Sequence, residues 1–324
     1  MFDMITIGDI KLDTFVVLDD ANVQCQIKMP ECQLCMEYGA KIAVEVVDSQ
    51  IAGTAPNIAI GLARMGFKTA VISNMGEDGT RKMALERLKA EKVSTQFVKA
   101  VKGAQSSYSA VLSFKGEKTI LTSHIPHINR LPRPMPKTNW FYIGEMGVGY
   151  GKLYATMAEH AKKTKSLLLG LNPGSIQIQE RKKCLYDLFK RTFVLFLNLE
   201  EAQTVTKSYT REIHHLSKSL WELGPHIVVI TDGKNGSHSF DGEELNFCPI
   251  FPGNMVESTG AGDSFATGFL GAIMNGLTHD EALRWGSVNA ASVVGQVGPT
   301  AGLLTASQIK SRLRARPSFK VKKE

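Results

Sequence analysis

The sequence predicts an α/β fold: a three-layer, doubly wound, mainly parallel sheet with a small β-sheet lid. Two observations lead to this prediction. Short apolar runs alternate along the chain with amphipathic helical patterns, which is typical of parallel sheets covered by helices on both faces. Two segments break this alternation and contain β-prone residues without a convincing helix. The chain has 324 residues, of which 43% are hydrophobic, enough to bury a large core.

The alternating elements can be assigned one by one. Compact hydrophobic runs typical of buried parallel strands occur at residues 5–10, 69–73, 140–144, 166–170, 193–197 and 227–231. Helical periodicity is found at residues 55–65, 79–92, 153–163, 179–191, 212–223 and 265–275. The order of these segments indicates a single α/β domain over residues 1–316.

The predicted lid comes from residues 14–48 and 105–123. Residues 107–122 alternate like an antiparallel hairpin whose turn is 115–118. A small sheet projecting over the carboxyl ends of parallel strands would lie where such folds bind ligands. We also expect that this lid can serve as the contact of a homodimer.

Composition and charge exclude several classes of protein. The net charge is +7, but the last fifteen residues carry seven basic residues and one acidic residue, so the remainder is close to neutral. The body is therefore not expected to bind nucleic acid, and residues 317–324 are expected to form a solvated or disordered basic tail. No run reaches the roughly 18 apolar residues of a membrane span, and the start lacks the pattern of a secretory signal.

Cysteine and histidine usage indicates a reducing compartment without structural zinc. Five scattered cysteines suit reduced thiols, so we expect a cytoplasmic protein. Cys32 and Cys35 form a C-x-x-C without a further ligand at suitable spacing, and we interpret them as packing residues. His124 and His127 form an H-x-x-H without a third ligand, so no zinc site is predicted there.

The glycine-rich turn at 260–263 carries the chemical interpretation. Gly260, Ala261 and Gly262 allow a ligand to approach the backbone closely, and a predicted helix follows with its free N–H groups and positive dipole end. Such a turn can hold a phosphate. Asp263 at its mouth would repel a resting anion unless it accepts a proton, as the base for a hydroxyl attacking ATP would do. The alternative is an acidic residue that only stabilises the helix dipole.

These residues resemble the second signature of the PfkB family of ribokinase-like carbohydrate kinases, which usually reads Asp-Thr-x-Gly-Ala-Gly-Asp. The resemblance implies that Asp263 is the catalytic base and that the backbone of 260–263 forms the anion hole. The chain departs from the pattern at Glu257 and Ser258, which keep a charge and a hydroxyl, respectively. The matches extend from Asp13 to about residue 301.

The same resemblance implies the substrate contacts. Residues 52–59 resemble the Gly-Gly-x-x-x-Asn-x-Ala region, so Gly53 and Asn57 are expected to bind substrate hydroxyls. Asp13 matches an aspartate that follows the first strand, and a carboxylate suits two sugar hydroxyls. Glu145, after the run 140–144, is a further expected contact.

The nucleotide and metal contacts are also implied by resemblance. Thr231, Gly233 and Gly236 match a nucleotide-binding turn, and Asn289 falls where relatives line the adenine pocket. Asn198 and Glu201 match an Asn-x-x-Glu that holds Mg²⁺ largely through water, although this pattern also describes a helix N-cap. A potassium site is expected from Glu257, Thr259, Gly298 and Gly302.

The predicted activity is ATP- and Mg²⁺-dependent phosphorylation of a sugar hydroxyl. Two alternatives remain open at this point: a nucleoside kinase of the same fold, with Tyr38 or Tyr108 stacking on the base, and a sugar-binding regulator without turnover. A sugar phosphate would require a basic clamp, for which the sequence offers Lys28, Lys41, Arg81 and Arg130.

Overall fold

A long sheet runs through the computed structural model, which describes residues 1–18, 22–25, 32–114, 117–124 and 131–324. The strand order is β16-β15-β14-β13-β12-β11-β10-β1-β6-β7, parallel from β7 to β13 and antiparallel beyond. The strands are β1 (Phe2–Ile7), β6 (Thr69–Gly76), β7 (Val98–Val101), β10 (Thr138–Ile143), β11 (Leu168–Leu171), β12 (Val194–Asn198), β13 (Ile227–Thr231), β14 (Ser237–Phe240), β15 (Leu245–Cys248) and β16 (Lys322–Lys323).

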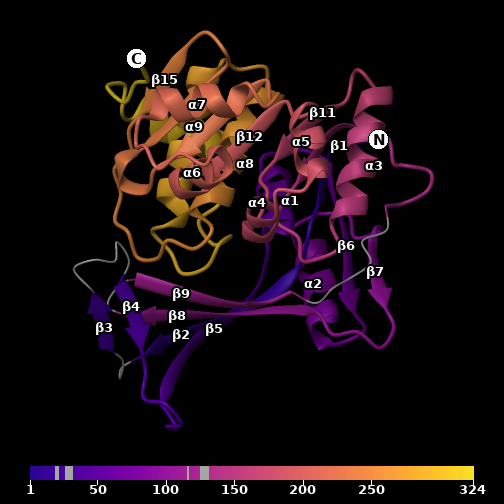
Figure 1. The fold of residues 1–324 in the computed structure, drawn as a ribbon, viewed down its shortest axis with the longest axis vertical. Helices are drawn as coiled ribbons and strands as arrows, with labels where there is room; N and C mark the ends of the chain where they lie inside the picture. The colour runs from indigo at the N-terminus through magenta and orange to yellow at the C-terminus, as the bar shows by residue number, and fades with distance from the viewer. Residues whose placement is uncertain (19–21, 26–31, 115–116, 125–130) are drawn as a thin grey trace.

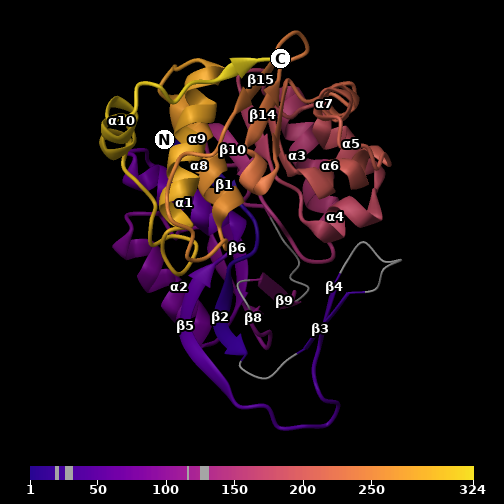
Figure 2. The same ribbon diagram turned by 90° about the vertical axis from the view of Figure 1, so that its left-hand side faces the viewer.

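Helices cover both faces of this sheet, as the side view in Figure 2 shows. One layer contains α1 (Thr54–Arg64), α2 (Gly79–Ala90), α8 (Ala261–Met274), α9 (His279–Val293) and α10 (Ala306–Arg314). The other contains α3 (Gly151–Lys163), α4 (Ser175–Glu180), α5 (Lys183–Phe189), α6 (Leu199–Thr206) and α7 (Ile213–Trp221). The predicted three-layer, doubly wound architecture is therefore confirmed.

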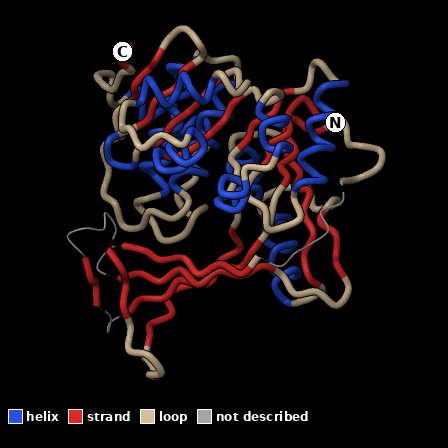
Figure 3. Tube along the Cα trace, in the orientation of Figure 1, coloured by secondary structure: helices blue, strands red, loops and turns tan. Residues whose placement is uncertain are grey.

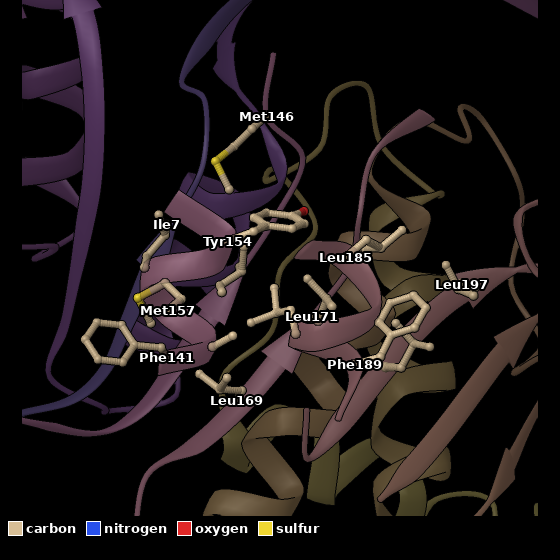
Figure 4. Packing of buried hydrophobic residues seen from close by; sticks show 14 of the residues in the cluster. Ile7, Phe141, Met146, Tyr154, Met157, Leu169, Leu171, Leu185, Phe189 and Leu197 are labelled. Atoms are coloured by element: carbon tan, nitrogen blue, oxygen red, sulfur yellow. The ribbon is translucent and has the colours of Figure 1, made fainter. Parts of the chain in front are cut away.

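The core between the sheet and the α3–α7 layer explains why its strands could be recognised. Ile7, Phe141 and Leu171 project from three neighbouring strands and pack against Tyr154 of α3 and Phe189 of α5 (Figure 4). All five are essentially inaccessible to water. Because a second apolar layer covers the opposite face, these strands are hydrophobic throughout rather than alternating.

The lid is a separate four-stranded sheet that lies beneath the α/β body (Figures 1 and 3). Its order is β5 (Val44–Ala52), β2 (Lys11–Leu18), β8 (Ser107–Phe114) and β9 (Glu117–Ser123). β2 pairs with β8 in parallel and with β5 antiparallel, and β8 and β9 form the predicted hairpin. A small arm of β3 (Asn22–Cys25) and β4 (Cys32–Cys35) extends from it. Residues 115–116 of the expected turn lie outside the described residues.

Three predicted boundaries are wrong. The first strand ends at Ile7 rather than residue 10, because the chain turns at Gly8 and Asp9 to enter the lid. The predicted helix 179–191 is two helices, separated where Arg181 adopts a left-handed conformation with φ of 47°. The helix after the glycine turn begins at Ala261, four residues earlier than expected, so Asp263 lies in its first turn.

The expectation of a solvated or disordered tail is also wrong. β16 pairs with β15, and Phe319 packs edge-on against Phe251 with ring centroids 5.1 Å apart. Apolar side chains at 319 and 321 between the basic residues provide the burial that a purely charged segment lacks. Within the described part of the chain, no helix combines the length and apolar character needed to cross a bilayer.

Replacement of Phe319 tests the anchoring of the C-terminal segment. Phe319→Ala should lower the free energy of unfolding by about 3 kcal/mol, because a buried aromatic ring is lost from the core. Urea unfolding measures this value. The exposed neighbour Lys320 provides the control, and an equally small effect of Lys320→Ala and Phe319→Ala would show that the tail is not anchored.

Candidate active site

The candidate active site lies where the carboxyl ends of the parallel strands meet the lid. Asp9 follows β1, Glu145 follows β10, Asn198 ends β12 and Thr231 ends β13. These strands are parallel, so their ends open at the same edge of the sheet, where doubly wound folds bind ligands. Asp263 belongs to this group: its carboxylate interacts electrostatically with Glu145 and Lys11.

The glycine turn before α8 has the geometry of an anion hole. Gly260 has a left-handed conformation with φ of 78°, and a Cβ there would lie 2.5 Å from Pro299 Cβ. A Cβ at Gly262 would meet no atom within 4 Å, so space is open beside this residue. The backbone N–H groups of Gly262 and Asp263 have no acceptor among the described residues, as expected for the first turn of a helix. The turn can therefore receive an anion.

The Asp263 carboxyl is placed to accept a proton. Asn57 Nδ2 donates a hydrogen bond to Oδ2 of Asp263 at 2.7 Å. Removal from water raises the pKa of Asp263 to about 6, although the hydrogen bonds from Asn57 and Thr54 favour the charged form. A carboxylate with this pKa is ionised at neutral pH but is more basic than an ordinary aspartate, which suits a general base.

Asn57 is oriented by an unusual start of α1. Gly53, which precedes the helix, has φ of 123°, and a Cβ there would lie 2.3 Å from the carbonyl oxygen of Asp9. Only glycine allows this close approach. Asn57 is buried in the first turn, and its Oδ1 has no hydrogen-bond partner among the described residues. An orphaned buried acceptor facing the site is suited to a substrate hydroxyl.

A network of ion pairs lies next to Asp263. Lys11 Nζ is 3.0 Å from Glu145 Oε2, and His124 is placed between Glu145 and Asp9, with its Nδ1 3.3 Å from Asp9 Oδ2. Hydrogen bonds that His124 donates to Asp9 and Glu145 raise the pKa of its imidazole to about 9. Burial would raise the pKa of Glu145, but His124 and Lys11 lower it to about 2. His124 and Glu145 are therefore both charged at neutral pH.

Asp13 faces this network from the lid. Lys11 and Asp13 are two residues apart on β2 and share one face of the sheet. Asp13 is buried, its Oδ1 lacks a partner among the described residues, and burial raises its pKa even though Lys11 and Ser109 act in the opposite direction. The structure thus brings Asp13, Asn57, Glu145 and Asp263 together, as the sequence predicts.

Asn198 and Glu201 form a reciprocal capping box at the start of α6. The Glu201 N–H donates to Asn198 Oδ1 at 2.8 Å, and the Asn198 N–H donates to Glu201 Oε2 at 2.9 Å. Burial and the nearby carboxylates Glu145 and Asp263 raise the pKa of Glu201 to about 7. The oxygen atoms of Asn198 and Glu201, with other carboxylates nearby, suit a Mg²⁺ ion that keeps its water shell. The hydrogen bonds of the capping box do not exclude this metal-binding role.

A pocket of about 260 Å³ lies beyond the glycine turn, between the carboxyl end of β13 and α9. Thr231, Gly233 and Gly236 line it as predicted, together with Gly262 of the anion hole. The exposed apolar side chains of Ile250 and Met255 complete its wall. A largely apolar pocket therefore adjoins the glycine turn that precedes Asp263.

Asn289 does not line this pocket. It is completely buried, donates to the Ser264 carbonyl at 2.7 Å and accepts from the Leu304 N–H at 3.0 Å. Its neighbours Ala290 and Ala291 line the pocket instead. Asn289 therefore holds α8, α9 and the following segment together rather than lining the pocket.

The residues expected to bind potassium are engaged within the protein. Glu257 Oε2 accepts from the Gly298 N–H at 2.7 Å, and its Oε1 accepts from the Thr259 N–H at 2.8 Å. Lys118, on β9 of the lid, forms an ion pair with the same carboxylate. Burial lowers the pKa of Lys118 to about 8, which leaves the ammonium group charged at neutral pH. Gly302 is packed against the Ser292 carbonyl, where a Cβ would lie at 2.2 Å.

Several residues of the site were missed by sequence reasoning. Asp9, Lys11 and His124 form the ion-pair network, Lys118 reaches the glycine turn, and Lys234 lines the nucleotide pocket. Lys11 could have been found, because it alternates with Asp13 on the same strand. The other partnerships join segments more than 100 residues apart or leave no local pattern.

Comparison with known proteins identifies relatives over almost the whole chain. The sequence model described as pfkB family carbohydrate kinase matches residues 13–306. An ATP-dependent 6-phosphofructokinase of Thermoanaerobacterium thermosaccharolyticum is 22% identical over 321 residues, covering 96% of this chain and 93% of its own. A 5-dehydro-2-deoxygluconokinase of Geobacillus thermodenitrificans is 25% identical over 282 residues, covering 80% and 83% of the two chains.

Solved structures share the fold at low sequence identity. The ribokinase of Arabidopsis thaliana, solved with ribose and ATP, superimposes with a TM-score of 0.79 at 20% identity, covering 97% of this chain and 99% of its own. An Escherichia coli ribokinase II structure with ATP and Mg²⁺ has a TM-score of 0.75 at 16% identity, covering 98% and 100%. The similarity confirms the ribokinase-like fold.

The charge of His124 should make stability depend on pH. Its pKa is raised from 6.5 to about 9 in the folded state, so its contribution is complete below pH 6.5 and is lost as the pH rises through 9. The contribution is at most about 3 kcal/mol. Urea unfolding of the wild type at pH 6, 7.5 and 9 should show this loss.

His124→Gln provides the comparison, because it removes the titrating group and keeps a polar side chain. The difference in unfolding free energy between wild type and variant should shrink toward pH 9. A difference that stays constant with pH would exclude a charged His124.

Proposed function

The chain belongs to the PfkB family of carbohydrate kinases, and we propose that it transfers the γ-phosphoryl group of ATP to a hydroxyl of an unphosphorylated sugar, with Asp263 as the base. The observation that carries this assignment is the pairing of Asp263 with the open backbone turn at 260–262. A proton acceptor with a pKa of about 6 stands in the first turn of a helix, beside space for an anion.

The reaction follows from this placement. Asp263 accepts the proton of the attacking hydroxyl, while the N–H groups of Gly262 and Asp263 face the charge that develops on the transferred phosphoryl group. Asn57 holds the carboxylate with one amide nitrogen and offers Oδ1 to a substrate hydroxyl. Asp13 supplies a second acceptor from the lid.

Magnesium and ATP complete the proposed site. Asn198 and Glu201 would hold Mg²⁺ largely through its water shell, and a bound ion would offset the negative charge of the phosphates. Thr231, Gly233 and Gly236 border the pocket expected to receive the nucleotide, and Lys234 adds a positive charge beside it.

The charge balance of the site favours a neutral sugar over a sugar phosphate. The two described cations that contact Glu145, Lys11 and His124, are both paired with carboxylates. Of the residues named for a phosphate clamp, Arg81 donates to the Val98 carbonyl and Lys41 is exposed. Lys28 and Arg130 lie outside the described residues. A neutral ketose or aldose therefore fits better than a phosphorylated sugar.

No specific observation favours either alternative function, the nucleoside kinase or the sugar-binding regulator. For a nucleoside substrate, Tyr38 is fully exposed, and Tyr108 lies on the face of β8 opposite to Ser109, which interacts with Asp13. For a regulator without turnover, the complete set of Asp263, open turn and nucleotide pocket would have no purpose. A homodimer through the lid and a cytoplasmic location stay predictions.

Substitution of the proposed base should abolish turnover selectively. Asp263→Asn should lower kcat by about 10² to 10⁴-fold, because the amide cannot accept the proton, whereas ATP affinity changes little. Wild-type kcat/KM should rise with pH through about 6, where the carboxyl ionises. Steady-state kinetics and calorimetric ATP binding measure both. Near-normal turnover of Asp263→Asn would refute the assignment.

A substrate panel tests the preference for neutral sugars. ADP release should be fastest with a neutral ketose or aldose, and at least about tenfold slower with fructose 6-phosphate or adenosine, because the described part of the site offers no free cation for a phosphate and no aromatic ring to stack on a base. Faster turnover of the phosphorylated sugar would show that a basic clamp exists. The absence of ADP release with every compound would support the regulator.

A further inference from the structure

Lys118 reaches from the lid to the loop that forms the anion hole. Its ammonium group contacts Glu257 and donates to Thr259 Oγ1 at 3.0 Å. Thr259 directly precedes Gly260, the residue whose left-handed conformation starts the turn. The side chains of Lys118 and Glu257 are 11% and 9% exposed, so this pair is largely shielded from water and from screening by salt.

The Glu257 carboxylate already has a cation and two N–H donors as partners. One oxygen accepts the Gly298 N–H and the other accepts the Thr259 N–H beside the ammonium group. The carboxylate carries one negative charge, which the ammonium balances. A potassium ion near the same oxygens would face a repelling positive charge. The donor set expected to hold potassium therefore does not fit a free ion in this chain.

We infer that Lys118 is a tethered cation that replaces a free monovalent ion at the Glu257 loop and orders the anion hole as the lid seats on it. The inference rests on the proposed kinase function and adds to it a positioning residue and a cation requirement. Lys118 acts through the loop rather than by touching the transferred group.

Strand register explains how a lid residue arrives at this position. Lys118 pairs with Ser113 on β8, which lies on the same face as Ser109, the partner of Asp13 on β2. One face of the lid thus presents Asp13 toward the proposed substrate position and Lys118 toward the anion hole. When this face of the lid packs against the α/β body, Asp13 and Lys118 reach their positions together.

The opposite edge of the lid contacts the same part of the body. Gln50 on β5 donates to the Val297 carbonyl at 3.5 Å, and its side chain fills the space where a Cβ of Gly298 would stand. Gly298 in turn donates to Glu257. Both edge strands of the lid sheet therefore meet on the segments that surround Glu257, which couples lid position to the geometry of the turn.

The decisive experiment compares monovalent salts. Wild-type kcat should change by less than about twofold between tetramethylammonium chloride and KCl at equal ionic strength, since general screening is then constant. Lys118→Met keeps much of the side-chain volume but removes the charge. In tetramethylammonium chloride, the kcat of Lys118→Met should be at least about tenfold lower than that of wild type. Replacing this salt by KCl or NH₄Cl should raise the kcat of the variant several-fold.

Thermal unfolding in the same salts supplies a readout that needs no turnover. The melting temperature of Lys118→Met should be lower than that of wild type and should rise specifically in KCl or NH₄Cl, whereas that of wild type should not. This arm decides the inference even if no tested sugar is phosphorylated. Lys102→Met, an exposed lysine between β7 and β8, is the matched control and should behave like wild type in both assays.

Two results would overturn the inference. One is a wild-type enzyme whose rate or melting temperature depends strongly on potassium while Lys118 is intact. The other is a Lys118→Met variant that matches Lys102→Met in rate, melting temperature and salt response. If Lys118→Met does not fold, as judged by far-ultraviolet circular dichroism, the wild-type salt series decides by the first criterion.

Discussion

The hydrogen bond between Asn57 and Asp263 joins the first turns of α1 and α8, and the chemistry of the site depends on it. Both helices point their amino ends at the same space, so their positive dipole ends favour an anion there. The bond holds the Asp263 carboxylate toward that space while leaving it basic enough to accept a proton. The backbone restrictions at Gly53 and Gly260 follow from this arrangement, because each allows a helix to start at a close approach.

Charge balance is the second constraint on the site. Buried carboxylates gather at the ends of the strands, and a buried charge is costly unless it is paired. Lys11 and His124 compensate Glu145 and Asp9, whereas Asp263 and Glu201 retain raised pKa values. Glu145 and Asp9 are thus neutralised by ion pairs, whereas the neighbouring Asp263 and Glu201 are left available for chemistry. In the proposed mechanism, the paired set would face the sugar, and the unpaired set would accept a proton and hold a metal ion.

The lid connects these two parts. Its four strands form one sheet, so side chains on a common face move together. Asp13 and Lys118 occupy opposite ends of this face and address the substrate and the anion hole, respectively. A ligand that pulls the lid toward Asp13 would therefore also bring the ammonium group of Lys118 to Glu257, which links substrate binding to readiness for phosphoryl transfer.

Much of this protein was determined by local sequence. Apolar strand runs, helix periodicity and the turn at 260–263 are encoded within short windows, so the doubly wound fold and the lid could be predicted. The grouping of Asp13 and Asn57 with Asp263 was implied by the resemblance to a known family rather than by any local pattern. Tertiary structure alone decided which charges pair. The partners of His124 and Lys118 lie more than 100 residues away, and Coulombic contacts depend on distance in space, which no pattern along the chain records. For the same reason Asn289 could not be told apart from a ligand contact before its neighbours were known, and the ordered tail depended on Phe319 meeting Phe251.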